Sequence, residues 1–265
     1  MSKTKLQKLR KGWSIQIRVL YALMIRELTT RFGRENIGFL WIMAEPLLFA
    51  VLVSLLWRLT KGAEDHGMSV VAFVVTGYIP LTLFRHVVQR SVVVFSVNSS
   101  LLYHRQITIL DFIFTRFLIE VIGCMMAYVF IASVLIAMDL FPVPKDVGLF
   151  LFGWFSYCLF CLSICLVISP LSEISETMEK LIPVTTYIMI PFSGSFTMVS
   201  WLAPELRDYL LWSPFVNGIE MMRGGIWGEK IATYYNPWNP IIISLPMIMI
   251  GLSLCRRVRR SLAVE

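Results

Sequence analysis

Residues 147–168 read VGLFLFGWFSYCLFCLSICLVI, a run that contains no charged residue. A helix needs roughly 20 apolar residues to cross a bilayer, because lipid cannot satisfy open backbone groups. This run therefore predicts a membrane-spanning helix. Cys158, Cys161 and Cys165 share one face of it, but no histidine or carboxylate accompanies them. We therefore expect them to pack as small apolar residues, and no metal site is predicted.

Five further runs have the length and apolarity of spans. They are residues 37–57, 70–89, 117–138, 181–203 and 237–255. The whole chain of 265 residues is 57% hydrophobic and only 15% charged, whereas soluble domains are about half apolar and a quarter charged. The predicted fold is an all-α membrane protein, with a six-helix transmembrane domain over residues 37–255.

The basic residues predict how this domain is oriented. The net charge is +7, but the Lys and Arg residues flank the spans, which argues against nucleic-acid binding. With both termini in the cytoplasm, 18 of the 24 Lys and Arg residues lie inside. The outer six are Arg58, Lys61, Lys145, Arg207, Arg223 and Lys230. Basic residues concentrate on the cytoplasmic side, so we expect a multi-pass protein with both ends in the cytosol.

The segments outside the spans have patterns of their own. Residues 1–36 are predicted to form a cytoplasmic, interfacial segment whose amphipathic helix lies on the membrane surface. Its apolar stripe consists of Trp13, Ile17, Leu20, Met24 and Leu28. Residues 256–265 are predicted to form a basic cytoplasmic tail.

Three connections predict further helices. A short cytoplasmic helix is expected after Asn98-Ser99-Ser100, and another helix start at Ser169-Pro170. Residues 204–236 are too apolar for a free outer loop. Pro204 and Ser213-Pro214 predict two short helices there that dip back toward the membrane.

The chain lacks the patterns of an enzyme. Its nearest approach to a phosphate-binding loop runs from Gly62 to Gly67, but Met68 stands where lysine is required. The Gly194-Ser195 pair has no histidine within a span to activate it. No catalytic residue is therefore predicted. If ATP drives this protein, a different chain binds it.

Two features within the spans leave alternatives open. Glu45-Pro46 predicts either a hinge or hydrogen bond at a dimer contact, or a tolerated kink. The aromatic residues of 201–238 predict an interfacial belt, or in part an exit path on which sugars pack. Such a path would continue through Trp41, Trp57, Phe73 and Tyr78.

The run TTRFGRENIGFLWIMAEPLL at 29–48 resembles the signature of ABC-2 type polysaccharide-export permeases, in the form found in the capsular branch. The residues that carry this resemblance are Arg31, Gly33, Arg34, Asn36, Gly38, Trp41, Glu45 and Pro46. A second run, SPFVNGIEMMRGGIWG at 213–228, is similar to the segment before that family's last span.

The resemblance implies a homodimer that works with two copies of a separate ATPase, which holds ATP and Mg. It implies export of lipid-linked acidic polysaccharide across the inner membrane of Gram-negative bacteria, with a periplasmic co-polymerase and an outer-membrane export channel. By analogy a coupling helix contacts the ATPase through Ser99, Ser100, Leu101, Leu102, Tyr103 and His104. The implied periplasmic gate comprises Trp212, Phe215, Glu220, Arg223 and Trp227.

Within this mechanism Arg85, Arg90 and Arg105 are hypothesised to meet an anionic head group or acidic sugar, because guanidinium pairs bidentately with carboxylate and phosphate. The same arginines are equally well explained as topology markers. Three other functions stay open. They are a permease of this class for O-antigen or teichoic acid, an ion-coupled carrier that works alone, and a membrane scaffold.

Overall fold

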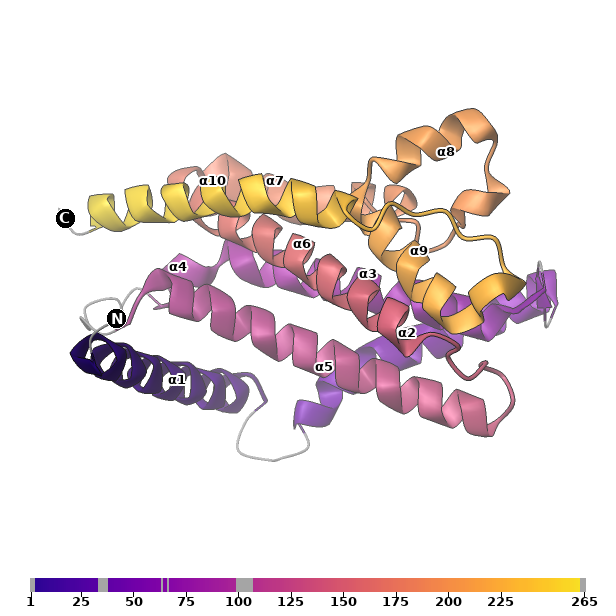
Figure 1. The fold of residues 1–265 in the computed structure, drawn as a ribbon, viewed down its shortest axis with the longest axis horizontal. Helices are drawn as coiled ribbons and strands as arrows, with labels where there is room; N and C mark the ends of the chain where they lie inside the picture. Colours follow the sequence, from indigo (N-terminus) through magenta and orange to yellow (C-terminus); the bar gives the residue numbers. More distant parts are fainter. Residues whose placement is uncertain (1–2, 33–37, 63, 66, 99–106, 263–265) are drawn as a thin grey trace.

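The computed structural model describes residues 3–32, 38–62, 64–65, 67–98 and 107–262. These residues form an elongated helical bundle (Figure 1). The two chain ends lie at one end of the bundle, and α8 and α9 lie toward the other end. The order of the elements is α1 Lys3–Phe32, α2 Gly38–Lys61, β1 Glu64–Asp65, β2 Met68–Ser69, α3 Val70–Val92, α4 Val94–Asn98, α5 Ile109–Ala137, α6 Val147–Ile174, α7 Glu176–Ile188, η2 Pro191–Ser193, η3 Val199–Trp201, α8 Pro204–Leu211, α9 Pro214–Trp227, η4 Gly228–Lys230 and α10 Asn239–Leu262.

In the described part of the chain, four helices are long and apolar enough to cross a membrane. They are α3, α5, α6 and α10 over Asn239–Arg259. The apolar stretch of α2 in the described chain, Leu47–Thr60, is shorter. A helical membrane protein is therefore confirmed, while the count of six spans stays a prediction.

The core of the bundle is built on α3 and α6. In an apolar stretch of 18 residues within α3, 83% of the residues are buried, whereas in the corresponding stretch of α10 only 22% are buried. Helix α6 packs against α3, α9 and α10. The hydroxyl group of Tyr157 on α6 donates to the carbonyl of Pro80 on α3 at 2.9 Å. Helix α10 therefore lies at the outside of the bundle and leaves most of its apolar surface for lipid.

The predicted helix start at Ser169-Pro170 is wrong. Helix α6 continues through Pro170 to Ile174, and Ser175 is the N-cap of the next helix. Pro170 has no N–H, so it leaves the carbonyl of Leu166 without its helical donor. The thiol of Cys255 donates to that carbonyl at 3.7 Å. Gly251 makes this approach possible, since a Cβ there would lie 2.7 Å from the Leu166 backbone.

The predicted span at 181–203 is also wrong as one continuous helix. Helix α7 has 13 residues, which is about 20 Å of length, whereas the hydrocarbon core is roughly 30 Å thick. After Ile188 the chain forms the short turns η2 and η3. Pro191 cannot donate a backbone hydrogen bond, and Gly194 has a φ of +73°, which ends helical geometry.

Other boundaries are confirmed or shifted. Pro204 and Pro214 do begin helices, as predicted. Helix α5 begins at Ile109, before the predicted 117, because Thr108 and Asp111 form a capping box. Helix α10 continues to Leu262, so most of the predicted basic tail 256–265 is helical, and its cytoplasmic location stays a prediction.

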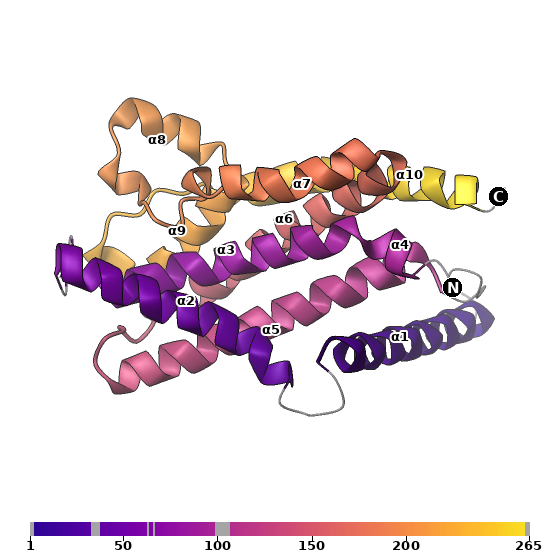
Figure 2. The ribbon, with the colours of Figure 1, turned by 180° about the vertical axis from the view of Figure 1, so that it is seen from behind.

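Helix α1 lies beside α5 at the end of the bundle that holds the termini (Figure 2). Its predicted apolar stripe divides into two parts. Leu20, Met24 and Leu28 are half-buried, whereas 69% of Trp13 and 59% of Ile17 is exposed. One apolar edge of α1 therefore packs on the protein, and another is left to contact a surface.

Candidate functional site

A cluster of ionised side chains joins α1, α3 and α5. Its centre is Glu120 on α5, whose side chain is 1% exposed. Arg31 on α1 donates to one oxygen of that carboxylate, and Nε of Arg90 on α3 lies 2.9 Å from the same oxygen. Nδ1 of His86 lies 3.1 Å from the other oxygen. One buried carboxylate thus has three partners from two other helices.

A second carboxylate extends this cluster. Oε1 of Glu27 lies 3.4 Å from Nη2 of Arg31 and 3.2 Å from Nε of Arg116. Nη1 of Arg116 also donates to the backbone carbonyl of Arg90 at 2.9 Å. We call Glu27, Arg31, His86, Arg90, Arg116 and Glu120 the ion-pair cluster. Removing one partner of a buried ion pair costs about 3–5 kcal/mol, so this cluster fixes α1 to the bundle.

Only part of the ion-pair cluster was predicted from the sequence. Arg31 stood out as part of the family motif and Arg90 as a candidate substrate contact, whereas Glu27, His86, Arg116 and Glu120 were not predicted. A signal for them exists, because the pairs Glu27/Arg31, His86/Arg90 and Arg116/Glu120 are each spaced i,i+4. That spacing places both residues of a pair on one helix face.

Arg223 on α9 forms a second buried site. Its side chain is fully buried. Nη1 donates to the carbonyls of Gly194 at 2.8 Å and Thr197 at 3.1 Å, and Nη2 donates to that of Ser195 at 2.7 Å. The guanidinium carbon lies 4.2 Å from the centre of the Phe73 ring. Arg223 therefore holds the segment between η2 and η3 against α3.

Glu220 belongs to the same site, one helical turn before Arg223. Its Oε1 lies 3.7 Å from Nη1 of Arg223. Its two oxygens accept from the backbone N–H groups of Val199 at 3.4 Å and Tyr234 at 3.3 Å. Burial raises the pKa of this carboxyl, which Arg223 and the two N–H groups partly oppose. We call Glu220, Arg223 and the carbonyls of 194–197 the Arg223 site.

Gly77 on α3 makes room for the Arg223 site. A Cβ at this position would lie 1.9 Å from the carbonyl oxygen of Ser195 and 2.9 Å from Nη2 of Arg223. Any side chain would therefore displace the segment from α3. The role of Gly77 was not predicted from the sequence, because a glycine inside an apolar helix does not reveal which segment packs on it.

The aromatic residues predicted to line a path contact one another in the core. The centre of the Phe73 ring lies 6.0 Å from the centre of the Trp57 ring and 4.9 Å from that of the Trp201 ring. Tyr78 stacks on Phe49 at 4.1 Å. Phe73 and Tyr78 are each 3% exposed, so within this chain they are packing residues. Their role in a path stays a prediction.

The predicted gate residues do not converge on one point. Trp212 is 76% exposed, whereas Phe215 and Trp227 are buried. Phe215 packs on Phe84 at 4.5 Å and on Phe160 at 4.8 Å. Trp227 packs near Phe141 at 6.4 Å. Only Glu220 and Arg223 share a site.

Several predicted residues lie outside the described part of the chain. They include Gly33, Arg34, Asn36, Arg105 and the coupling residues Ser99, Ser100, Leu101, Leu102, Tyr103 and His104. Gly38, Trp41, Glu45 and Pro46 lie on α2, but their side chains are not described. Arg85 is described, and its guanidinium carbon lies 5.2 Å from the centre of the Tyr187 ring on α7. Among described residues, no three His, Cys, Asp or Glu residues are placed to hold a metal ion.

Comparison with known proteins assigns the chain to a family. The model of the ABC-2 type transporter family matches residues 18–227. The chain is 38% identical to the capsule polysaccharide export inner-membrane protein CtrC of Neisseria meningitidis serogroup B, over 91% of each chain. It is 33% identical to the capsule polysaccharide export inner-membrane protein BexB of Haemophilus influenzae over 92% of each. The polysialic acid transport protein KpsM of Escherichia coli is 24% identical, over 93% of this chain and 96% of that protein. This chain is a member of the ABC-2 type transporter family.

Proposed function

We propose that this chain is the permease subunit of an ATP-driven exporter that moves lipid-linked, acidic capsular polysaccharide across the bacterial inner membrane. The observation that carries the proposal is the 38% identity, over almost the full length, to a capsule export inner-membrane protein. The four long apolar helices support the location. ATP and Mg are bound by a partner ATPase, because this sequence has no phosphate-binding loop.

The proposed orientation places both termini in the cytoplasm. Both chain ends lie at the same end of the bundle (Figure 1). The positive-inside distribution of Lys and Arg residues supports the same direction. A cysteine introduced at Lys11 should then react with a membrane-impermeant maleimide only from the cytosol, and one at Lys230 only from the periplasm. The native cysteines are buried and give little background.

Motion of the ATPase is proposed to enter the bundle through α1 and the segment that follows α4. Nη1 of Arg26 on α1 lies 3.2 Å from Oδ1 of Asn98, the last residue of α4. Gln16 on α1 also donates to Asp111 in the first turn of α5. Helix α1 therefore contacts both sides of the predicted coupling residues. The ion-pair cluster is proposed to pass this motion on to α3 and α5.

The complete exporter is proposed to contain two copies of this chain and two ATPase subunits, with a co-polymerase and an outer-membrane channel completing the route. Arg85 is a better candidate than Arg90 for contact with anionic cargo. No ion pair joins it to a carboxylate in the described part of the chain, whereas Arg90 is paired with Glu120. The gate role of the 204–228 helices is also part of the proposal.

Reconstitution tests this function. The chain should be placed in proteoliposomes with its ATPase and with lipid-linked capsular glycan, and glycan accessible on the far side should be measured. Transport should require ATP and should stop when the ATPase cannot hydrolyse it. Transport by this chain alone, driven by an ion gradient, would instead establish an ion-coupled carrier.

A further inference from the structure

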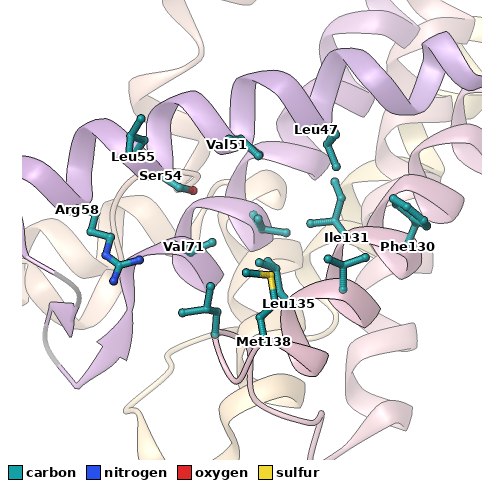
Figure 3. Close-up of a pocket in the computed structure, with 14 residues that line it drawn as sticks. Leu47, Val51, Ser54, Leu55, Arg58, Val71, Phe130, Ile131, Leu135 and Met138 are labelled. Atoms are coloured by element: carbon teal, nitrogen blue, oxygen red, sulfur yellow. The ribbon is translucent and has the colours of Figure 1, made fainter.

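An apolar groove lies between α2, α3 and α5 (Figure 3). Its volume is about 310 Å³, which is at the lower limit of the roughly 300–1,000 Å³ of small-molecule sites. Its walls are Leu47 and Val51 from α2, Val71 and Val75 from α3, and Ile131 and Leu135 from α5. No element within the described chain fills it. Phe130 and Val134, which also line it, are exposed on the outer face of α5.

Two polar groups in this groove stand out against the apolar walls. Ser54 is 4% exposed, and its hydroxyl has no hydrogen-bond partner among the residues that the structure describes. Arg58 lies one helical turn further along α2, and both side chains line the groove (Figure 3). No ion pair joins Arg58 to a carboxylate in the described part of the chain. A buried hydroxyl without a partner carries a free-energy cost, so this groove suits a ligand that supplies an acceptor.

The order of these groups matches one kind of molecule. Along α2 an apolar wall is followed by a buried hydroxyl and then by a guanidinium, with about 6 Å of helix rise between Ser54 and Arg58. An anionic phospholipid has the same order of acyl chain, ester oxygens and phosphate. Arginine binds phosphate bidentately and stays charged, and the ester oxygens can accept from a hydroxyl.

We propose that this groove binds one anionic phospholipid of the surrounding bilayer. One acyl chain lies between α2, α3 and α5, an ester oxygen accepts from Ser54, and the phosphate pairs with Arg58. Arg58 is one of the six basic residues predicted to lie outside, so the lipid belongs to the periplasmic leaflet in the proposed orientation. The site requires only that the chain lies in a bilayer, so it can be tested separately from glycan export.

Native mass spectrometry of the full chain in mild detergent tests this site. Dioleoyl phosphatidylglycerol and dioleoyl phosphatidylcholine should be titrated in parallel. The wild-type chain should retain one phosphatidylglycerol in preference to phosphatidylcholine. Arg58→Gln should reduce that preference about fivefold, because one arginine near anionic lipid is worth about 1 kcal/mol. Ser54→Ala should weaken retention of both lipids, because both carry the ester oxygens that the hydroxyl would meet.

Filling the groove provides an independent variant. Leu55 lines the groove and is 55% exposed, so Leu55→Trp should block lipid without disturbing the core. Leu56→Trp is the matched control, because Leu56 is 58% exposed and lies outside the groove. Lys230→Gln is the control for loss of a positive charge, because Lys230 is also predicted to lie outside. Both controls should bind lipid as the wild type does.

Three results would overturn the proposal. The first is equal retention of the two lipids by the wild type. The second is unchanged binding in both Arg58→Gln and Leu55→Trp. The third is a Leu55→Trp variant that is monomeric although the wild type is dimeric, and that retains lipid as the wild type does. That last result would show that a second copy of the chain occupies the groove.

Discussion

Two sites in the bundle each bury an arginine beside a glutamate, but they satisfy the charges in different ways. In the ion-pair cluster, Glu120 is surrounded by side chains from α1 and α3. In the Arg223 site, the guanidinium donates to three backbone carbonyls, and its carboxylate partner is 3.7 Å away. One site joins rigid helices, and the other holds a segment that is not helical.

This difference between the two sites follows from what each of them must stabilise. Helices satisfy their own backbone, so α1, α3 and α5 can be joined only through side chains. The segment between η2 and η3 leaves carbonyls without partners, and such groups are tolerated at membrane depth only when protein satisfies them. We therefore expect the ion-pair cluster to transmit movement from one helix to another. The Arg223 site should instead stabilise the conformation of one loop.

The largest effect is expected from Glu120→Ala. This change leaves Arg31, His86 and Arg90 facing one another without the carboxylate, and it should lower the free energy of unfolding by about 3–5 kcal/mol. Denaturant titration in detergent micelles measures this. Glu173→Ala is the control. Glu173 is exposed at the C-terminal end of α6, so its replacement should be close to neutral. A near-neutral Glu120→Ala would mean that the cluster is not a structural link.

A somewhat smaller effect is expected from Arg223→Lys. Lysine keeps the charge but lacks the planar fork, so at least one carbonyl of 194–197 loses its donor. The expected loss is about 1–3 kcal/mol. Limited proteolysis between residues 190 and 203 should accelerate more than cleavage elsewhere. Arg256→Lys, at an exposed position of α10, is the matched control. Uniform destabilisation without local cleavage would contradict the loop-holding role.

Gly77→Ala tests the same loop from the side of α3. The new methyl group would overlap the carbonyl of Ser195, so we expect a loss of about 1–3 kcal/mol. Gly12→Ala on α1 is the control, because nothing lies within 4 Å of a Cβ there. Helix propensity alone should stabilise that variant slightly. Equal thermal stability of the two variants would contradict the close contact.

The smallest change in stability is expected from Arg90→Gln. The Arg90 side chain is 41% exposed, and Glu120 keeps Arg31 and His86 as partners. Solvent screening should limit the loss to less than about 1 kcal/mol. Glycan export should be measured in the same cells. A large loss of export at nearly unchanged stability would support a role in cargo contact or coupling, and unchanged export would argue against both.

Much of the fold could be predicted from the sequence because it depends on local chemistry. Apolar runs with no more than one charged residue each identified α3, α5, α6 and α10, although α5 begins at Ile109 and not at the predicted 117. Proline at the first helical position marked α8 and α9. The i,i+4 pairs of the ion-pair cluster also stand in the sequence. Which helices these pairs would face cannot be deduced from one helix alone.

The errors share a physical cause. Ser169-Pro170 has the pattern of a helix start, yet α6 continues through it, and the thiol of Cys255 on α10 donates to the carbonyl of Leu166 that Pro170 leaves open. The run 181–203 has the apolarity of a span, yet it bends after α7, and Arg223 satisfies the carbonyls exposed there. In both places a residue distant in the sequence donates to a carbonyl that the local backbone leaves open, and no local pattern reveals that donor.

By itself, the sequence determined that this protein lies in a membrane, that it is helical, and which export family it resembles. Those properties follow from hydrophobicity, charge distribution and short motifs, all of which are written along the chain. Only the tertiary structure decided that Glu220 and Arg223 hold a loop, that Arg90 is paired with Glu120, and that α2, α3 and α5 leave a groove beside Arg58. Those properties depend on contacts between residues far apart in the chain, and no local pattern specifies them.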